Sequence, residues 1–219
     1  SPGPTLSKIV PKIGDMAKIL YIIYLALTMV EFALLMVAGM GPFDAAIHAM
    51  GTAGTGGFSN YVSSVGYFQS GWIDLIITAF MLFFGTNFAL YYRLFTGGWR
   101  DALRSEELRW YLGIFLVATG MITVMILPQY GSWVQALRYA GFQVSSVMST
   151  TGFATADFNL WPVAAKMVIV ILMFIGSCAG STAGGIKVAR VVILQKVSVS
   201  EMRRMLHPNA VPAIQFEGK

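Results

Sequence analysis

Two short segments of this sequence carry residue types that can bind a cation through the backbone. The first reads GTGGF (54–58) and the second STTGF (149–153). Glycine permits backbone angles that turn successive carbonyl oxygens to one side, and a ring of such oxygens can replace the water shell of a cation. A single Thr-x-Gly triplet is weak evidence for a cation site. The prediction is stronger if both segments lie between the same kinds of structural element.

The two segments occupy equivalent places in a repeat. When Gly57 is aligned with Gly152, IHAMGTAGTGGFS (47–59) lies over FQVSSVMSTTGFA (142–154) without a gap, at a spacing of 95 residues (57 to 152). Each copy is preceded by a segment predicted to be a short helix, 43–52 in the first and 133–148 in the second, and long apolar runs flank both. The sequence therefore predicts two tandem copies of one unit.

The elements that must hold these segments are long and apolar. Of the 219 residues, 56% are hydrophobic and only 11% are charged, which is typical of a membrane protein. Runs of about 20 apolar residues, the length of a membrane-spanning helix, occur at 19–40, 72–92, 110–128 and 162–194. The predicted fold class is an all-α integral membrane protein with two tandem span, pore loop, span repeats.

Charge placement predicts the orientation in the membrane. Basic residues concentrate before the first span, between the second and third, and after the fourth: Lys8, Lys12, Lys18, Arg93, Arg100, Arg104, Arg109, Lys196, Arg203, Arg204 and Lys219. The positive-inside rule places these regions, and both ends of the chain, in the cytoplasm. Segments 41–71 and 129–161 should face the outside, because together they contain a single lysine or arginine, Arg138. Because these charges flank apolar spans and the sequence predicts no basic helix that could contact bases, we expect no nucleic-acid binding.

An outside segment too short to cross the membrane must enter it and return. Irregular backbone at membrane depth persists only where it is buried in protein or lines a path for water or ions, and the preceding short helix points its partially negative C-terminal end at the same place. We therefore predict selectivity-filter strands that bind a cation through backbone carbonyls; the alternative is that each glycine merely ends a helix and starts a turn. The proposed residues are Thr55, Gly56, Gly57, Thr150, Thr151 and Gly152.

A glycine-rich stretch, GSCAGSTAGG (176–185), interrupts the fourth apolar run. An unbroken helix over 162–194 would be about 50 Å long against a hydrocarbon core of about 30 Å, so a break is expected here. Alternatively, the small side chains of this stretch could serve to let neighbouring helices pack closely. GSCAG also has the form of a nucleophile elbow, but no strand precedes it and His48 and His207 are poorly placed, so we predict no enzyme.

Two basic residues, Lys187 and Arg190, follow the glycines one helical turn apart. Charged side chains at membrane depth usually face a bundle interior or an aqueous cavity, and a positive charge beside a cation path raises the barrier to ions. Either residue could hold a gate closed. The alternative is that both extend to the cytoplasmic headgroups.

Four pieces of the chain together resemble the Trk/Ktr/HKT superfamily of potassium transporters, most closely its TrkH-like membrane subunits. They are FDAAIHAMGTAGTGGFS, STTGFATADFNLWP, GSCAGSTAGGIKVARVVIL and MRRMLHPNAV. The resemblance implies four span, loop, span units around one pore, of which this chain has the second and third. It also implies that the glycine-rich stretch is an intramembrane gate, carried by Gly176, Gly180, Ser181, Thr182, Gly184, Gly185, Lys187 and Arg190.

The resemblance implies further properties. They are K+ as the transported ion with no covalent cofactor, a bacterial inner membrane location in contact with lipid, a homodimer of complete subunits, and a cytoplasmic nucleotide-binding regulatory subunit. The remaining two pore repeats, or a second copy of the chain, would complete the ring. We also keep two alternatives, a half-size cation channel subunit that dimerises and a membrane scaffold that transports nothing.

The expected organisation has five parts. A cytoplasmic segment (1–18) precedes the first repeat (19–92), a cytoplasmic elbow linker with an interfacial helix follows (93–109), and the second repeat (110–196) ends in a cytoplasmic tail (197–219).

Overall fold

The computed structural model describes residues 10–95 and 104–206, and their regular structure is helical apart from one isolated bridge between Ile175 and Ile186. This agrees with the predicted all-α class. The helices are α1 (Val10–Val37), α2 (Pro42–Ala53), α3 (Gly71–Phe84), α4 (Phe88–Phe95), α6 (Glu106–Tyr130), α7 (Trp133–Met148), α8 (Val163–Phe174) and α9 (Val188–Leu206), with short 3-10 turns η2 (Ser64–Phe68) and η3 (Phe158–Leu160).

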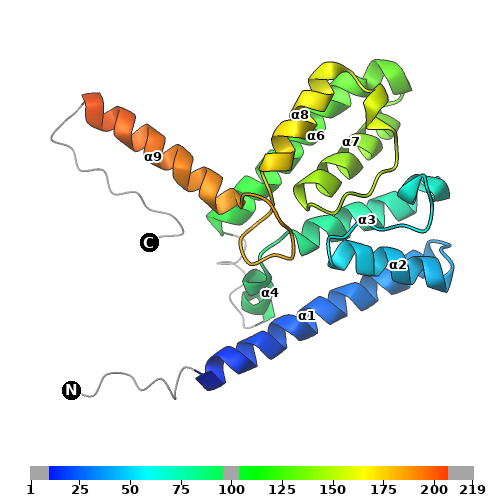
Figure 1. Cartoon of the computed structure of the whole chain (residues 1–219), viewed down its shortest axis with the longest axis horizontal. Helices are drawn as coiled ribbons and strands as arrows, with labels where there is room; N and C mark the ends of the chain where they lie inside the picture. The colour runs from blue at the N-terminus through cyan, green and yellow to red at the C-terminus, as the bar shows by residue number, and fades with distance from the viewer. Residues whose placement is uncertain (1–9, 96–103, 207–219) are drawn as a thin grey trace.

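The two halves of the chain are built alike and lie side by side (Figure 1). In the first half α2 packs against α1 and α3, and in the second α7 packs against α6 and α8. The halves meet where α3 contacts α7. Both predicted short helices are confirmed, since α2 and α7 cover 43–52 and 133–148.

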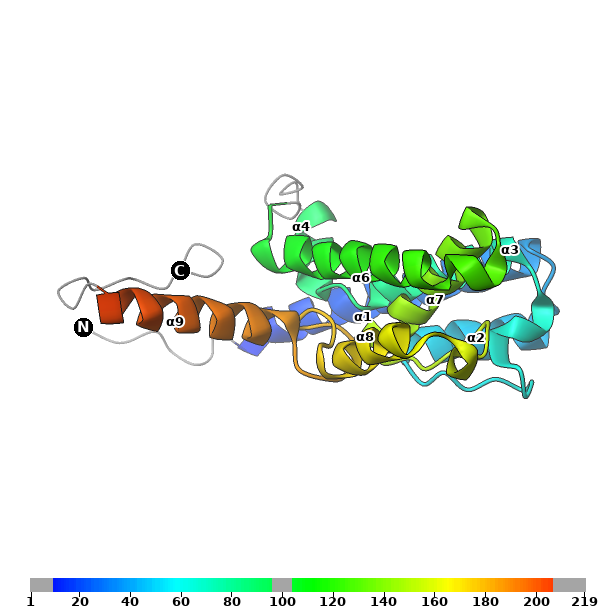
Figure 2. The same ribbon diagram turned by 90° about the horizontal axis from the view of Figure 1, so that it is seen from above.

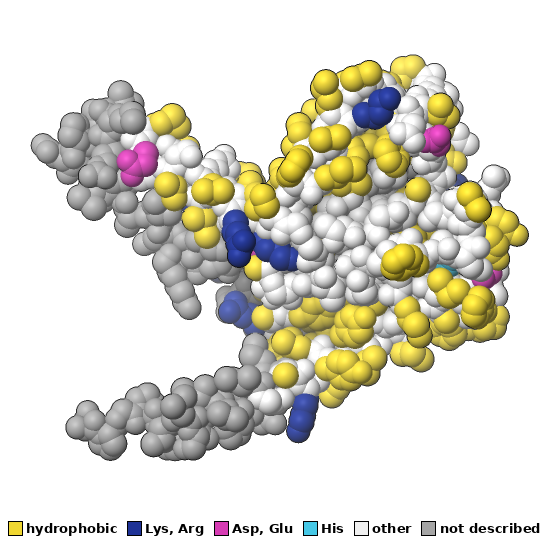
Figure 3. All heavy atoms as spheres, in the orientation of Figure 1, with side chains coloured by type: hydrophobic (Ala, Val, Ile, Leu, Met, Phe, Trp, Pro, Cys, Tyr) yellow, Lys and Arg dark blue, Asp and Glu magenta, His cyan; other side chains and the backbone are white. Residues whose placement is uncertain are grey.

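Among the described residues, two helices are long and apolar enough to cross a membrane, Ala17–Val37 within α1 and α6, and the bent pair α3 and α4 would make a third if it forms one span. Their outer faces carry large apolar side chains that the described protein leaves exposed, among them Tyr21, Met29, Leu116 and Val124. Figure 3 shows apolar side chains spread over much of the face in view. Such a surface is unfavourable in water and favourable against lipid.

The predicted span over 72–92 is wrong as a single helix. It consists of α3 and α4, which are bent by 91° where residues 85–87 interrupt the helix. The cause lies in the glycine-rich stretch, whose backbone takes over the hydrogen bonds of a continuing helix. Cys178 N–H donates to the Gly85 carbonyl, and Phe88 N–H donates to the Gly180 carbonyl.

The predicted break in the fourth apolar run is confirmed. Helix α8 ends at Phe174, and α9 begins only at Val188. Figure 2 shows α9 extending beyond the bundle at the end where α4 lies, whereas the α1–α2 and α6–α7 connections lie at the other end. Residues 96–103 of the interfacial helix predicted within 93–109 lie outside the described residues; α4 ends at Phe95 and α6 begins at Glu106.

Candidate functional site

The two segments that carry the Thr-x-Gly triplets have the same hydrogen bonds at the repeat spacing of 95 residues. Gly56 N–H donates to the Gly51 carbonyl at 2.8 Å, and Thr151 N–H donates to the Ser146 carbonyl at 3.0 Å. The residues on either side repeat this match, at 54 and 149, 55 and 150, and 57 and 152. In both copies the chain turns sharply after the helix C-terminus, so that its amides donate to carbonyls of the last helical turn.

The backbone angles of the two segments also match. The angle φ is +50° at Thr55 and +56° at Thr150, and +63° at Gly57 and +89° at Gly152. Left-handed backbone is costly for threonine, about 1–2 kcal/mol, so its presence at two equivalent threonines is a constrained feature of each segment. The carbonyls of both segments therefore follow similar, non-helical paths.

The two segments approach each other closely on one side only. A methyl group added to Gly57 would overlap the carbonyl oxygen of Thr151, whereas one added to Gly152 would meet nothing within 4 Å. The first segment thus lies against the backbone of the second. Gly152 faces a side that the described residues leave open.

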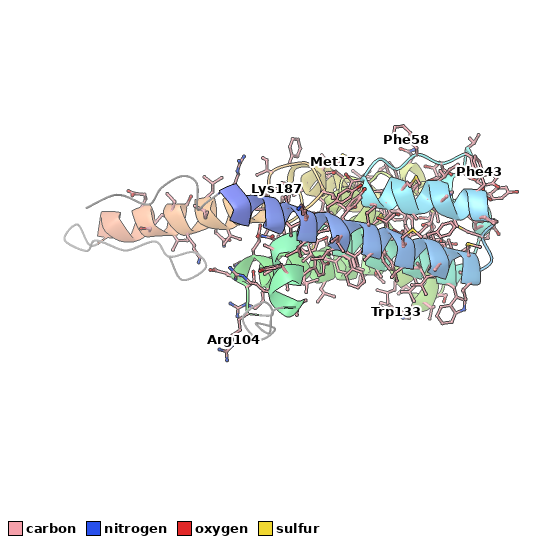
Figure 4. The ribbon with its side chains drawn as sticks, turned by 90° about the horizontal axis from the view of Figure 1, so that it is seen from below. Phe43, Phe58, Arg104, Trp133, Met173 and Lys187 are labelled. Atoms are coloured by element: carbon pink, nitrogen blue, oxygen red, sulfur yellow. The ribbon has the colours of Figure 1, made fainter. Side chains whose placement is uncertain are left out.

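The phenylalanine after each triplet has a different environment in the two copies. Phe153 is fully buried and stacks on the imidazole of His48 from α2, with ring centroids 5.4 Å apart. Phe58, its equivalent, is 79% exposed and points away from the bundle, as does Phe43 (Figure 4). The second triplet is therefore anchored on the helix of the first copy, and Phe58 has no such helix within the described residues.

Polar side chains of α2 hold the residues that follow the first triplet. The ring nitrogens of His48 lie 2.8 Å from the Asp44 carbonyl oxygen and 3.0 Å from Ser59 Oγ. His48 therefore connects α2 to the segment that follows the first triplet. Asp44, in the first turn of α2, accepts hydrogen bonds from Asn60 Nδ2 at 2.7 Å and Tyr61 Oη at 2.9 Å. The hydrogen bond to Asp44 raises the pKa of Tyr61 above its usual value, because ionised Tyr61 could not donate it.

The glycine-rich stretch forms a closed loop with its ends together. Gly176 N–H donates to the Ile186 carbonyl at 2.8 Å. A methyl group on Gly176 would overlap the carbonyl of Gly184, and Gly180 and Gly185 have φ of +70° and +75°. These glycines are therefore required for the path of the loop.

The same loop contacts both triplets through equivalent threonines. Thr55 Oγ1 donates to the Thr182 carbonyl at 3.4 Å, and Gly184 N–H donates to Thr150 Oγ1 at 2.8 Å. Ser181 closes a turn inside the loop by donating to the Cys178 carbonyl at 2.7 Å. Of the residues predicted to act together, the structure thus brings 176–185 beside the two triplets.

A residue that sequence reasoning missed anchors this loop from the side. Glu107, at the start of α6, is buried, and its carboxylate accepts the Ala179 N–H at 2.6 Å. Its only signal in the sequence is an acidic residue at the start of an apolar run, which is also the usual composition of a helix N-terminus. Ser177 Oγ adds a second anchor by donating to the Met148 carbonyl at 2.9 Å.

The two basic residues differ in their surroundings. The ammonium of Lys187 donates to the Ala183 carbonyl, so Lys187 closes the loop on itself. The side chain of Arg190, in the first turn of α9, is exposed. Asp157 accepts a hydrogen bond from Asn159 N–H and precedes η3, and Asn87 accepts one from Ala89 N–H at the start of α4.

Comparison with known proteins places this geometry in a family. The TrkH family model, described as cation transport protein, matches residues 5–219. Trk system potassium uptake protein TrkH of Halomonas elongata is 38% identical over 98% of this chain and 45% of that protein. Trk system potassium uptake protein TrkG of Escherichia coli strain K12 is 33% identical over 100% of this chain and 46% of that protein.

A solved structure agrees with these relatives. The crystal structure of the potassium transporter TrkH from Vibrio parahaemolyticus matches with a TM-score of 0.90 and 37% identity, covering 95% of this chain and 46% of that one. The chain spans about half the length of the curated relatives that it matches. From the match over nearly all of its residues, the chain belongs to the TrkH family of cation transport proteins.

Proposed function

We propose that this chain forms two of the pore units of a potassium uptake protein in a bacterial inner membrane. Its family is one of cation transport proteins, and the relatives named above are potassium uptake proteins. Membership of a transport family agrees with the prediction that the chain is not an enzyme. The units are the predicted repeats, 19–92 and 110–196, each a span, a pore loop and a second span.

Potassium passes between the two triplets in this proposal. Helices α2 and α7 end at the triplets, so the partial negative charge of each C-terminus favours a cation there. The backbone carbonyls at 55–57 and 150–152 take the place of water around the ion. Equal hydrogen bonds and equal signs of φ in the two copies support equal roles.

Further units complete the ring. Phe153 packs on the pore helix of the neighbouring copy, and the exposed Phe58 is its equivalent at the open edge of the pair. We infer that Phe58 packs on the pore helix of another unit, from the remaining repeats or from a second copy of the chain. A homodimer of complete subunits, the docking of a cytoplasmic nucleotide-binding subunit and cytoplasmic chain ends remain parts of this proposal.

The loop at 176–185 is the gate. The observation that carries the proposal is that this one loop hydrogen-bonds to both equivalent threonines, Thr55 and Thr150. A segment in that place blocks the path of an ion leaving both triplets. Its glycines allow the rearrangement that opening requires, and Lys187 holds the closed form through the Ala183 carbonyl.

Deletion of residues 181–184 tests the gate because it removes both contacts with the threonines. We expect higher K+ flux per molecule, without a regulator, for the assembled transporter, meaning this chain with the units that complete its ring. Flux is measured in liposomes and normalised to purified protein.

A matched pair of substitutions controls for damage to folding. Thr150→Val removes the hydroxyl that accepts Gly184 N–H, whereas Thr28→Val removes a hydroxyl that donates to the Tyr24 carbonyl within α1, far from the loop in sequence. Regulator-free flux should rise in the first and stay unchanged in the second. A deletion that assembles normally and conducts no faster would rule out the gate, and lower abundance without faster flux would indicate a packing role.

A further inference from the structure

A buried ion pair joins the two pore units at a distance from the triplets. Arg138 Nε, on α7, lies 2.6 Å from Asp74 Oδ2, in the first turn of α3. The Asp74 side chain is 2% exposed and that of Arg138 is 26% exposed. The pair therefore connects the second span of one unit to the helix that ends in the triplet of the other.

The pair has no equivalent elsewhere in the described chain. At the repeat spacing of 95 residues, Phe43 takes the place of Arg138 and Ile169 takes the place of Asp74. A charged pair that merely stabilised the unit would be expected in both copies. This one belongs to the junction between the units.

A polar cavity of about 270 Å³ lies beside the pair, lined also by Gln69, Gln135, Tyr139 and Thr155. Two oxygens of its lining, Asp74 Oδ1 and Thr155 Oγ1, are buried and have no hydrogen-bond partner among the described residues. Buried polar atoms are nearly always paired, with protein or with ordered water. A polar cavity of this size holds several water molecules, so water is the ligand that its chemistry fits.

The first unit also contacts the irregular segment that follows the second triplet. Gly66 N–H donates to the Ala154 carbonyl at 3.1 Å, and Ser64 Oγ accepts the Ala154 N–H at 3.3 Å. A methyl group on Gly66 would lie 2.8 Å from the Thr155 carbonyl oxygen, so the two backbones are in direct contact. The second triplet is therefore held on both sides, by Arg138 through α7 and by residues 64–66 through Ala154.

We propose that Asp74, Arg138 and the water-filled cavity form a clamp that determines ion selectivity by positioning the second triplet. Asp74 and Arg138 are positioning residues, because they act on the carbonyls at 150–152 through α7 and the segment 153–155. Water in the cavity connects Asp74 Oδ1 to Thr155 Oγ1. The proposal rests on the potassium pore proposed above and adds the residues that fix its width.

The test compares Arg138→Gln and Thr155→Val with a control ion pair in the assembled transporter. The control is Glu106→Gln. It removes the carboxylate in the first turn of α6 whose Oε1 lies 2.5 Å from Lys196 Nζ. In liposomes, we expect Arg138→Gln to lower the ratio of K+ to Na+ flux about tenfold, equivalent to about 1.4 kcal/mol of discrimination. Thr155→Val should lower it less, Arg138→Lys should restore part of it, and Glu106→Gln should leave it unchanged.

The flux ratio is measured per assembled molecule, so loss of abundance alone does not move it. A second readout, hydrogen exchange of the amides at 153–155, does not depend on transport. It should accelerate in Arg138→Gln and in Thr155→Val but not in the control. Unchanged exchange in both variants would overturn the clamp, as would faster exchange with an unchanged flux ratio. If the wild-type protein conducts no cations, the proposed pore and the selectivity role are refuted. Faster exchange of amides 153–155 in the variants would then still establish that the Asp74–Arg138 pair holds that segment.

Discussion

The sharpest prediction concerns Gly57, because the structure separates two effects of adding a side chain there. With φ at +63°, any L-residue at this position costs about 1–2 kcal/mol in backbone strain. The added methyl group would also overlap the Thr151 carbonyl oxygen, so one of the two triplets must move. Gly57→Ala should therefore displace a proposed K+ ligand as well as strain the chain.

Gly131 offers a matched control for strain alone. Its φ is +66° at the end of α6, and a methyl group there would meet nothing within 4 Å. Gly131→Ala should lower stability by about 1–2 kcal/mol and leave ion discrimination intact. Gly152→Ala, strained at φ +89° but unobstructed, should fall between the two.

The assay is the ratio of K+ to Na+ flux in liposomes containing the assembled transporter, with thermal unfolding measured on the same preparations. A carbonyl that moves by enough to lose about 1.4 kcal/mol of K+ preference lowers this ratio about tenfold. We expect at least that loss in Gly57→Ala. If Gly57→Ala keeps the wild-type ratio, or if Gly131→Ala loses as much, the filter assignment is refuted.

Three further predictions use the same protein. A cysteine at the exposed position of Arg104 should react only with a reagent on the cytoplasmic side, and one at Ser63 only from outside; reversed labelling would invert the topology. Glu107→Ala leaves the Ala179 N–H without its buried partner, costing about 1.5–3 kcal/mol for a hydrogen bond to a charged group, and should raise regulator-free flux; unchanged flux in the assembled protein would exclude Glu107 as an anchor of the gate. Phe58→Ser should weaken assembly with the units that complete the ring while leaving each unit folded, which native mass measurement and circular dichroism together would check; assembly equal to wild type would contradict the role given to Phe58.

The parts of the structure that sequence alone could predict are those determined by local pattern. The two short helices follow from residues within them, and the equivalence of the triplets follows from the ungapped alignment of 47–59 with 142–154. The break in the fourth apolar run follows from its glycines and its excess length. Each of these depends on residues close together in the chain.

The bend between α3 and α4 could not be predicted in this way. Residues 72–92 are apolar enough for one helix, and Gly85 alone is a weak reason to interrupt it. The interruption depends on partners about ninety positions later, where Cys178 N–H and the Gly180 carbonyl replace helical hydrogen bonds. The Asp74–Arg138 pair was missed for the same reason, since neither residue has a local signal of its partner.

This dependence connects the proposed gate to the bent helix. While the loop is in place, it satisfies the Gly85 carbonyl and the Phe88 N–H. If the loop withdrew, these groups would be left unpaired at membrane depth, which costs several kcal/mol for each group. The arrangement that satisfies them without the loop is a continuous helix from α3 into α4. Opening of the gate should therefore be accompanied by straightening of the 91° bend, and an unchanged distance between spin labels on α3 and α4 in the 181–184 deletion would contradict this coupling.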